Sequence, residues 1–131
     1  MDRMSIAESV KEWHEAADKD IASAHHLLSM YPVPLEPICY LCQQCAEKYI
    51  KSYLVHNDED VVKTHDLVKL IKLCAEFNDS FMEIIEQCSV LVRYISDTRY
   101  PSKLELTGYD VKKALEYAEE IKMFVLRHIH D

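Results

Sequence analysis

The stretch from Pro37 to His56 constrains the fold more than any other part of the chain, because it is apolar on two sides of a helix. One face carries Ile38, Leu41, Cys42, Cys45, Tyr49 and Tyr53, and a second strip adds Ala46, Ile50 and Leu54. A helix that is apolar on two sides has to be covered on both of them. The segment is therefore predicted to be the central helix of a bundle. Its polar row is narrow and comprises Tyr40, Gln44, Glu47, Lys48 and Lys51.

Capping signals mark two further helices, one near each end of the chain. Ser5 with Glu8 three residues later is the pattern of a capping box. The amphipathic stripe that follows ends before the prolines of residues 31–37, since each proline disfavours helix at the residue before it. Thr107 with Asp110 predicts the start of the last helix in the same way.

Two more helical segments are expected between these. One opens at Thr64 or Asp66, and the next follows residues 78–80 and ends before Pro101. With one glycine and four prolines, the chain has little turn chemistry for an all-β fold. We predict a single all-α domain over residues 1–131, an antiparallel up-and-down bundle of four long helices plus a fifth C-terminal helix, because short connections make consecutive helices antiparallel.

The charge balance restricts what this chain can bind. A net charge of -8 opposes general nucleic-acid binding, because contact with phosphates needs a basic surface. Any nucleotide or RNA site must therefore be a local basic pocket on an acidic body. The one clear reversal of sign lies between residues 90 and 104, where Asp97 is the single acid beside Arg93, Arg99 and Lys103.

The sequence gives no sign of a membrane segment. No apolar run approaches the roughly 18 residues that are needed to cross a bilayer. Residues 1–5 lack the apolar core of a signal peptide. We expect a cytoplasmic protein with no membrane contact, and its five cysteines are then expected to be reduced thiols.

The cysteines and histidines do not have the arrangement expected of metal ligands. Cys39, Cys42 and Cys45 have the spacing of an iron–sulfur loop, but within a helix they turn around the axis and cannot all face one metal. They are expected to be core residues. The paired histidines His25-His26 and His128-x-His130 lack the i, i+4 spacing of a helical zinc site. We expect no metal and no cofactor, and His128 and His130 should favour the last carbonyls of their helix.

Lys48, Lys51 and His65 are candidate binding residues. On a central helix little polar surface is available, so the row with Lys48 and Lys51 should line a groove or an interface; bundle-internal hydrogen bonds or a dimer contact are the alternative. His65 lies at a predicted helix start, where free backbone N–H groups favour anions. The alternative is that Thr64 and Asp66 cap the helix while His65 bonds a neighbouring helix.

Arg93, Arg99 and Tyr100 are the remaining candidates, where the fourth helix ends. Arginine offers a bidentate fork for phosphate, and tyrosine offers a ring on which a base can stack. The structural alternative is that Arg99 caps helix carbonyls, while Tyr100 packs on Trp13 or on the second helix.

Three short stretches stand out when they are taken together: QQCAEKYIK at residues 43–51, KTHDL at 63–67 and YISDTRYP at 94–101. They resemble the HEPN family, small helical domains of prokaryotes that also occur in some large animal proteins. The order, spacing and residue types all agree, and the resemblance runs from about Trp13 to the C-terminus.

The resemblance implies a helical module that binds the phosphate of a nucleotide or RNA. The residues expected to carry that binding are Lys48, Lys51, His65, Arg93, Arg99 and Tyr100. It also implies pairing of two copies through helical faces, and two-fold dimers are the commonest oligomers. A separately encoded minimal nucleotidyltransferase is the expected partner, in a toxin–antitoxin-like pair.

One departure from the family bears on catalysis. Many HEPN domains that cleave RNA carry an arginine followed four to six residues later by a histidine, and no arginine in this chain has a histidine at that distance. RNase activity therefore does not carry over, and no catalytic residue is assigned. The alternatives are a metal-independent endoribonuclease that uses Arg93 or Arg99 with His65, and a purely structural dimerisation or scaffold module.

Overall fold

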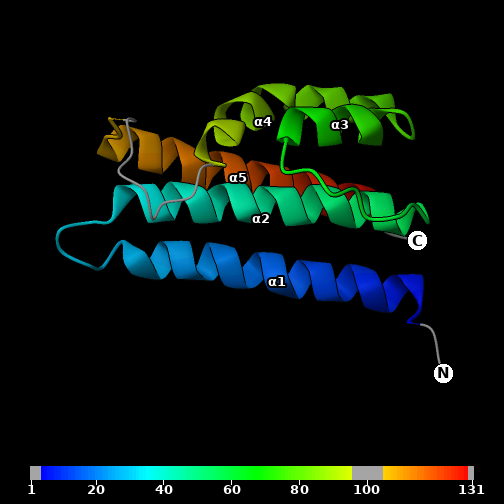
Figure 1. Cartoon of the computed structure of the whole chain (residues 1–131), viewed down its shortest axis with the longest axis horizontal. Coiled ribbons are helices and arrows are strands. Elements are labelled where there is room, and N and C mark those ends of the chain that lie inside the picture. Colours follow the sequence, from blue (N-terminus) through cyan, green and yellow to red (C-terminus); the bar gives the residue numbers. More distant parts are fainter. Residues whose placement is uncertain (1–3, 96–104, 130–131) are drawn as a thin grey trace.

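The computed structural model describes residues 4–95 and 105–129, and within these ranges all regular secondary structure is helical (Figure 1). The three long helices are α1 (Ile6–Leu27), α2 (Leu35–His56) and α5 (Gly108–His128). Each of them begins and ends close to the position predicted from periodicity and capping. Every helix in the described ranges is too short or too polar to span a bilayer.

The third and fourth helical segments are shorter than the other three. They are α3 (Leu67–Ala75) and α4 (Ile85–Leu91), and α4 is flanked by the 3-10 turns η1 (Asp79–Ile84) and η2 (Val92–Tyr94). The all-α prediction and the five helical segments are confirmed, although three helices rather than four are long. The fourth segment opens with a 3-10 turn after Asn78, whose side chain accepts a hydrogen bond from the backbone N–H of Ser80, 3.0 Å away.

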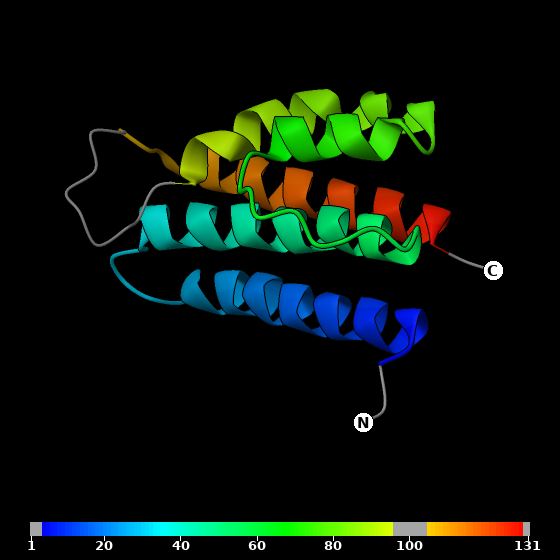
Figure 2. The same ribbon diagram turned by 45° about the vertical axis from the view of Figure 1, so that its right-hand side comes forward.

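Helix α2 is the centre of the bundle, as its two apolar sides predicted. It lies between α1 and the pair formed by α3 and α4, and α5 runs beside it (Figures 1 and 2). Fourteen of the 22 residues of α2 are buried, against four of the 22 in α1. An outer helix contributes one stripe to the core, whereas a central helix is covered on most of its circumference.

Local capping accounts for where three helices start. Both expected capping boxes are present, Ser5 with Glu8 on α1 and Thr107 with Asp110 on α5. Of the two residues proposed to open α3, Asp66 is the cap, since its carboxylate accepts from two backbone N–H groups of the first turn.

The connection from α2 to α3 departs from a simple up-and-down order. Residues 57–66, here called the strap, contain no helix and run back along α2 before α3 begins (Figure 2). As a result α3 points in the same direction as α2, while α1 and α2, and also α3 and α4, are antiparallel. A short turn would have made α2 and α3 antiparallel, so the strap decides this part of the topology.

Several large apolar residues near the ends of the helices are exposed. Ile6, Leu28 and Phe77 are 43%, 40% and 44% exposed. Each lies at or beyond an end of its helix, where the neighbouring helices no longer cover it. Leu41, expected in the core, is only partly buried and packs against it, whereas Ile50 is fully buried.

The five cysteines are free thiols buried in the core. Burial raises the pKa of Cys39, Cys45 and Cys88 to about 12 and also raises the pKa of Cys42 and Cys74. Thiols with such pKa values stay protonated at neutral pH and behave as small apolar side chains. The prediction that they are core residues is confirmed.

Candidate functional site

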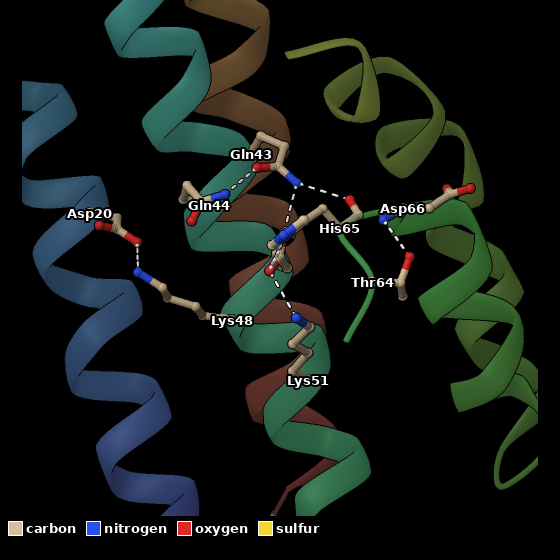
Figure 3. A network of polar contacts seen from close by, with 9 residues as sticks. Asp20, Gln43, Gln44, Lys48, Lys51, Thr64, His65 and Asp66 are labelled. Atoms are coloured by element: carbon tan, nitrogen blue, oxygen red, sulfur yellow. Dashed lines mark hydrogen bonds and ion pairs between the residues drawn. The ribbon is translucent and has the colours of Figure 1, made fainter. Parts of the chain in front are cut away.

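The polar row of α2 is divided between two sides of the helix. Lys48 turns toward α1, where its Nζ lies 2.6 Å from Oδ2 of Asp20 (Figure 3). Lys51 lies on the side that the strap covers, and Glu47 contacts both Lys51 and the strap residue His65 there. The two lysines, expected to act together, therefore belong to different clusters.

Glu47 is the centre of a buried polar cluster on the strap side. Its carboxylate is 5% exposed, and it accepts hydrogen bonds from Lys51 Nζ at 3.0 Å and from the side-chain amide of Gln43 at 3.1 Å. A third donor is Nδ1 of His65, which lies 3.0 Å from both carboxylate oxygens. Buried charges are costly unless they are paired and hydrogen-bonded. Glu47 satisfies this condition, since each of its oxygens has partners.

The strap is tied to α2 at His65. Besides the ring contact, the backbone carbonyl of His65 accepts a hydrogen bond from the amide nitrogen of Gln43 at 3.2 Å. Gln44 in turn donates to the amide oxygen of Gln43 at 2.7 Å, which sets the orientation of that buried amide. The next residue, Asp66, caps α3. One segment therefore closes the cluster and starts the following helix.

The His65 ring is anchored on one edge and exposed on the other. Its side chain is 64% exposed, although Nδ1 contacts a buried carboxylate. An ionised carboxylate only accepts hydrogen bonds, so the proton of this contact resides on Nδ1. The other ring nitrogen, Nε2, can then accept a hydrogen bond when the ring is neutral and donate one when it is protonated. The contacts foreseen in the structural alternative are present, and the ring remains accessible to a ligand.

Of the remaining predicted site residues the structure describes Arg93, which follows α4. Arg93 is exposed in η2, with its guanidinium carbon 5.7 Å from the centroid of the Tyr94 ring. The turn η2 contacts α2, and it belongs to the α3–α4 layer on the side of α2 away from α1 (Figure 1). Arg99 and Tyr100 lie outside the described residues, and so do the contacts expected for them.

A second polar cluster joins α1, α2 and α5 and was not predicted. The Tyr49 hydroxyl donates to Oδ1 of Asp18, and Lys122 Nζ lies 3.0 Å from the same oxygen. Burial alone would raise the pKa of Asp18, but the hydrogen bonds from Tyr49 and Lys122 outweigh it and hold that pKa below its ordinary value. Beside them the His14 ring stacks on Tyr49 and contacts Ser52.

No sequence signal marks this second cluster. In the sequence Tyr49 lies on an apolar face of its helix. Asp18 and Lys122 lie on helices far away in the chain, at positions where exposure to solvent is expected. Glu47 did carry a signal, because it stands in the polar row of an otherwise apolar helix. Gln43, next to that row, is fully buried and was not singled out.

The histidines at the helix ends make local contacts. Nδ1 of His128 lies 2.7 Å from the carbonyl oxygen of Phe124, which confirms the expected contact with the last carbonyls of α5. His25 lies 3.6 Å from Glu119, and His130 lies outside the described residues. Within residues 4–95 and 105–129, no three histidine, cysteine or acidic side chains converge as metal ligands.

Fold and site together define a small all-helical bundle that holds an exposed histidine on a buried carboxylate. A family model described as HEPN domain matches residues 10–129. The chain therefore belongs to the HEPN domain family, in agreement with the resemblance of its three sequence stretches.

Two solved structures share this fold. The crystal structure of ST0689, an archaeal HEPN homologue, matches with a TM-score of 0.72 at 23% identity, over 99% of this chain and 100% of that one. The crystal structure of TT1696 from Thermus thermophilus matches with a TM-score of 0.79 at 22% identity, over 92% and 98% of the two chains. At these identities the likeness concerns the fold alone. No curated protein matches the chain.

Proposed function

We propose that this HEPN module binds a phosphate group of a nucleotide or of RNA, on the side of α2 that carries the strap and η2. The observation that carries the proposal is the His65 ring, which is 64% exposed while its Nδ1 is held by the buried Glu47. An exposed ring held in one orientation is preorganised for a ligand. Arg93 adds an exposed cationic residue in η2, a turn that contacts α2.

The lysines are assigned a supporting part in this site. Lys48 is paired with Asp20 and Lys51 with Glu47, so both charges are already engaged within the bundle. The ligand contacts proposed for the described residues are therefore His65 and Arg93. Arg99 and Tyr100 remain candidates from the sequence, because an arginine fork and an aromatic ring suit a nucleotide.

Calorimetry with ATP, GTP and short RNA tests the proposal. His65→Ala and Arg93→Ala should each weaken binding by about 1–3 kcal/mol, the range of one charge-assisted contact, without a comparable loss of thermal stability. Lys19→Ala removes an exposed positive charge from α1 and should leave the affinity unchanged. If the wild-type chain binds none of these ligands at millimolar concentration, phosphate binding is refuted and the scaffold function replaces it.

An endoribonuclease is the second candidate, and the geometry of His65 favours it. A histidine oriented by a carboxylate through Nδ1, with Nε2 on the exposed edge, is arranged as a general base. It would take the proton of a ribose 2′-hydroxyl as that oxygen bonds to the phosphorus, while the bond from phosphorus to the 5′-oxygen of the next nucleotide breaks and that oxygen takes a proton from water. Cleavage of a short RNA in EDTA that leaves a 2′,3′-cyclic phosphate, and that is lost in His65→Ala, would establish this function. Binding without cleavage would support the first proposal.

We further propose that the protein is a homodimer and the partner of a separately encoded minimal nucleotidyltransferase. Membership of the HEPN family supports both proposals, because the family resemblance implies pairing of two copies and pairing with a nucleotidyltransferase. Sedimentation should show a dimer at micromolar concentration, and monomer alone would refute that part. Co-purification with the product of an adjacent nucleotidyltransferase-like gene would support the second part, and the absence of any complex would refute it.

A further inference from the structure

The ion pair between Glu47 and Lys51 is almost completely buried. The two side chains are 5% and 7% exposed, and the neighbouring Gln43 is fully buried. Apolar residues of the same volume often stabilise a core as well as a buried ion pair does, or better. Stability alone does not explain the pair, and the only exposed group that it holds among the described residues is the ring of His65.

We infer that Glu47, supported by Lys51 and Gln43, is a positioning residue that keeps His65 in the tautomer with its proton on Nδ1, and that binding of an oxyanion at Nε2 is coupled to the uptake of one proton. This inference rests on the proposed phosphate site and specifies how that site is regulated. The ligand class is a phosphate or a similar tetrahedral oxyanion.

The tautomer follows from the donors and acceptors around Glu47. Lys51 is an ammonium and the Gln43 amide nitrogen is also a donor, so both stabilise the ionised carboxylate that accepts from them. The 3.0 Å contact to His65 then requires a proton on Nδ1. A histidine free in water favours a proton on Nε2 instead, so Glu47 reverses the ordinary preference.

Proton coupling follows from what Nε2 presents to a ligand. In the neutral ring Nε2 carries a lone pair, and phosphate oxygens also carry lone pairs, so the two repel each other. In the protonated ring Nε2 becomes a charged N–H donor, and charge-assisted hydrogen bonds to phosphate are strong. The charged groups near the ring are Glu47 and Lys51 from α2, with Lys63 and Asp66 beside it in sequence. Affinity should therefore be higher at a pH where the ring is protonated than at a pH where it is neutral.

Nitrogen-15 NMR of the imidazole rings tests the tautomer without any ligand. At pH 8 the wild-type His65 should show a protonated Nδ1 and an unprotonated Nε2. His128 serves as an internal reference, because its Nδ1 also donates, here to a backbone carbonyl 2.7 Å away. Glu47→Gln should shift His65 toward the ordinary tautomer, whereas Glu76→Gln, the same change at an exposed position, should not. A wild-type His65 with its proton on Nε2 overturns the inference, even if Glu47→Gln fails to fold.

A sulfate titration followed at the His65 resonances tests the coupling. Sulfate keeps its charge between pH 5.5 and pH 8, so a change in affinity reports on the protein alone. Binding should be about tenfold tighter at pH 5.5 than at pH 8, which corresponds to about 1.4 kcal/mol. Equal affinity at the two pH values refutes proton coupling while leaving phosphate binding intact. If neither sulfate, nucleotide nor RNA binds at either pH, the proposed function and the coupling fail together, and the tautomer measurement still decides the role of Glu47.

Discussion

Replacing Ile50 by alanine tests the central position of α2. Ile50 is fully buried, and the change deletes three carbon atoms, at about 0.8 kcal/mol for each buried methylene, or about 2.4 kcal/mol. Collapse around the site is incomplete in a helix covered on both sides. A residual cavity of about 50 Å³ would add about 1.2 kcal/mol at roughly 24 cal/mol per Å³. The expected loss in the free energy of unfolding is therefore about 3–4 kcal/mol.

Leu41→Ala is the matched control, since Leu41 lies on the same helix but is only partly buried. It should cost about 1–1.5 kcal/mol, because the site opens to solvent and leaves little cavity. Urea unfolding monitored by circular dichroism at 222 nm measures both losses, provided that the slope with denaturant is unchanged. Equal losses for the two variants, or a loss below about 1 kcal/mol for Ile50→Ala, would refute the arrangement around α2.

Three further outcomes are expected. Tyr49→Phe removes the hydroxyl that donates to Asp18 and should cost about 1 kcal/mol in urea unfolding; no loss would show that this cluster contributes nothing to stability. Burial lowers the pKa of His14 from its ordinary 6.5, so the folded state favours the neutral ring. The free energy of unfolding should therefore be highest above pH 6.5 and should decrease as the pH falls below that value. Urea unfolding at pH 7.5 and 5.5 should show this decline and His14→Gln should reduce it, whereas an equal decline in both proteins would contradict the assignment. In native protein the thiols, including Cys39 and Cys45 with pKa values of about 12, should resist iodoacetamide over hours at pH 7.5 and react fully in urea, and rapid alkylation without denaturant would contradict a packed core.

Local patterns in the sequence were enough for much of the fold. The capping boxes at Ser5 and Thr107 depend on contacts between residues three apart. The central position of α2 follows from two apolar strips, each with helical period. The HEPN family was likewise recognisable, because its three sequence stretches keep their order and spacing.

The candidate site was predictable only in part. His65 and Lys51 were expected near each other, and they are joined through Glu47. Lys48, three residues from Lys51, was expected beside them but pairs with Asp20 on α1. A long side chain on a central helix can turn to either flank of that helix. The flank that it takes depends on the charges that the neighbouring helices present, and these become known only once the helices are packed.

What the sequence by itself determined is the set of helices, their caps and the helix that lies at the centre, because these depend on residues a few positions apart. Only the tertiary structure decided which polar groups meet. The contact of Glu47 with His65 spans 18 residues, that of Lys48 with Asp20 spans 28, and that of Tyr49 with Asp18 spans 31. Such contacts form because the strap and α1 pack against α2, and burial then forces each polar group to find a partner. Periodicity within one helix carries no information about that choice.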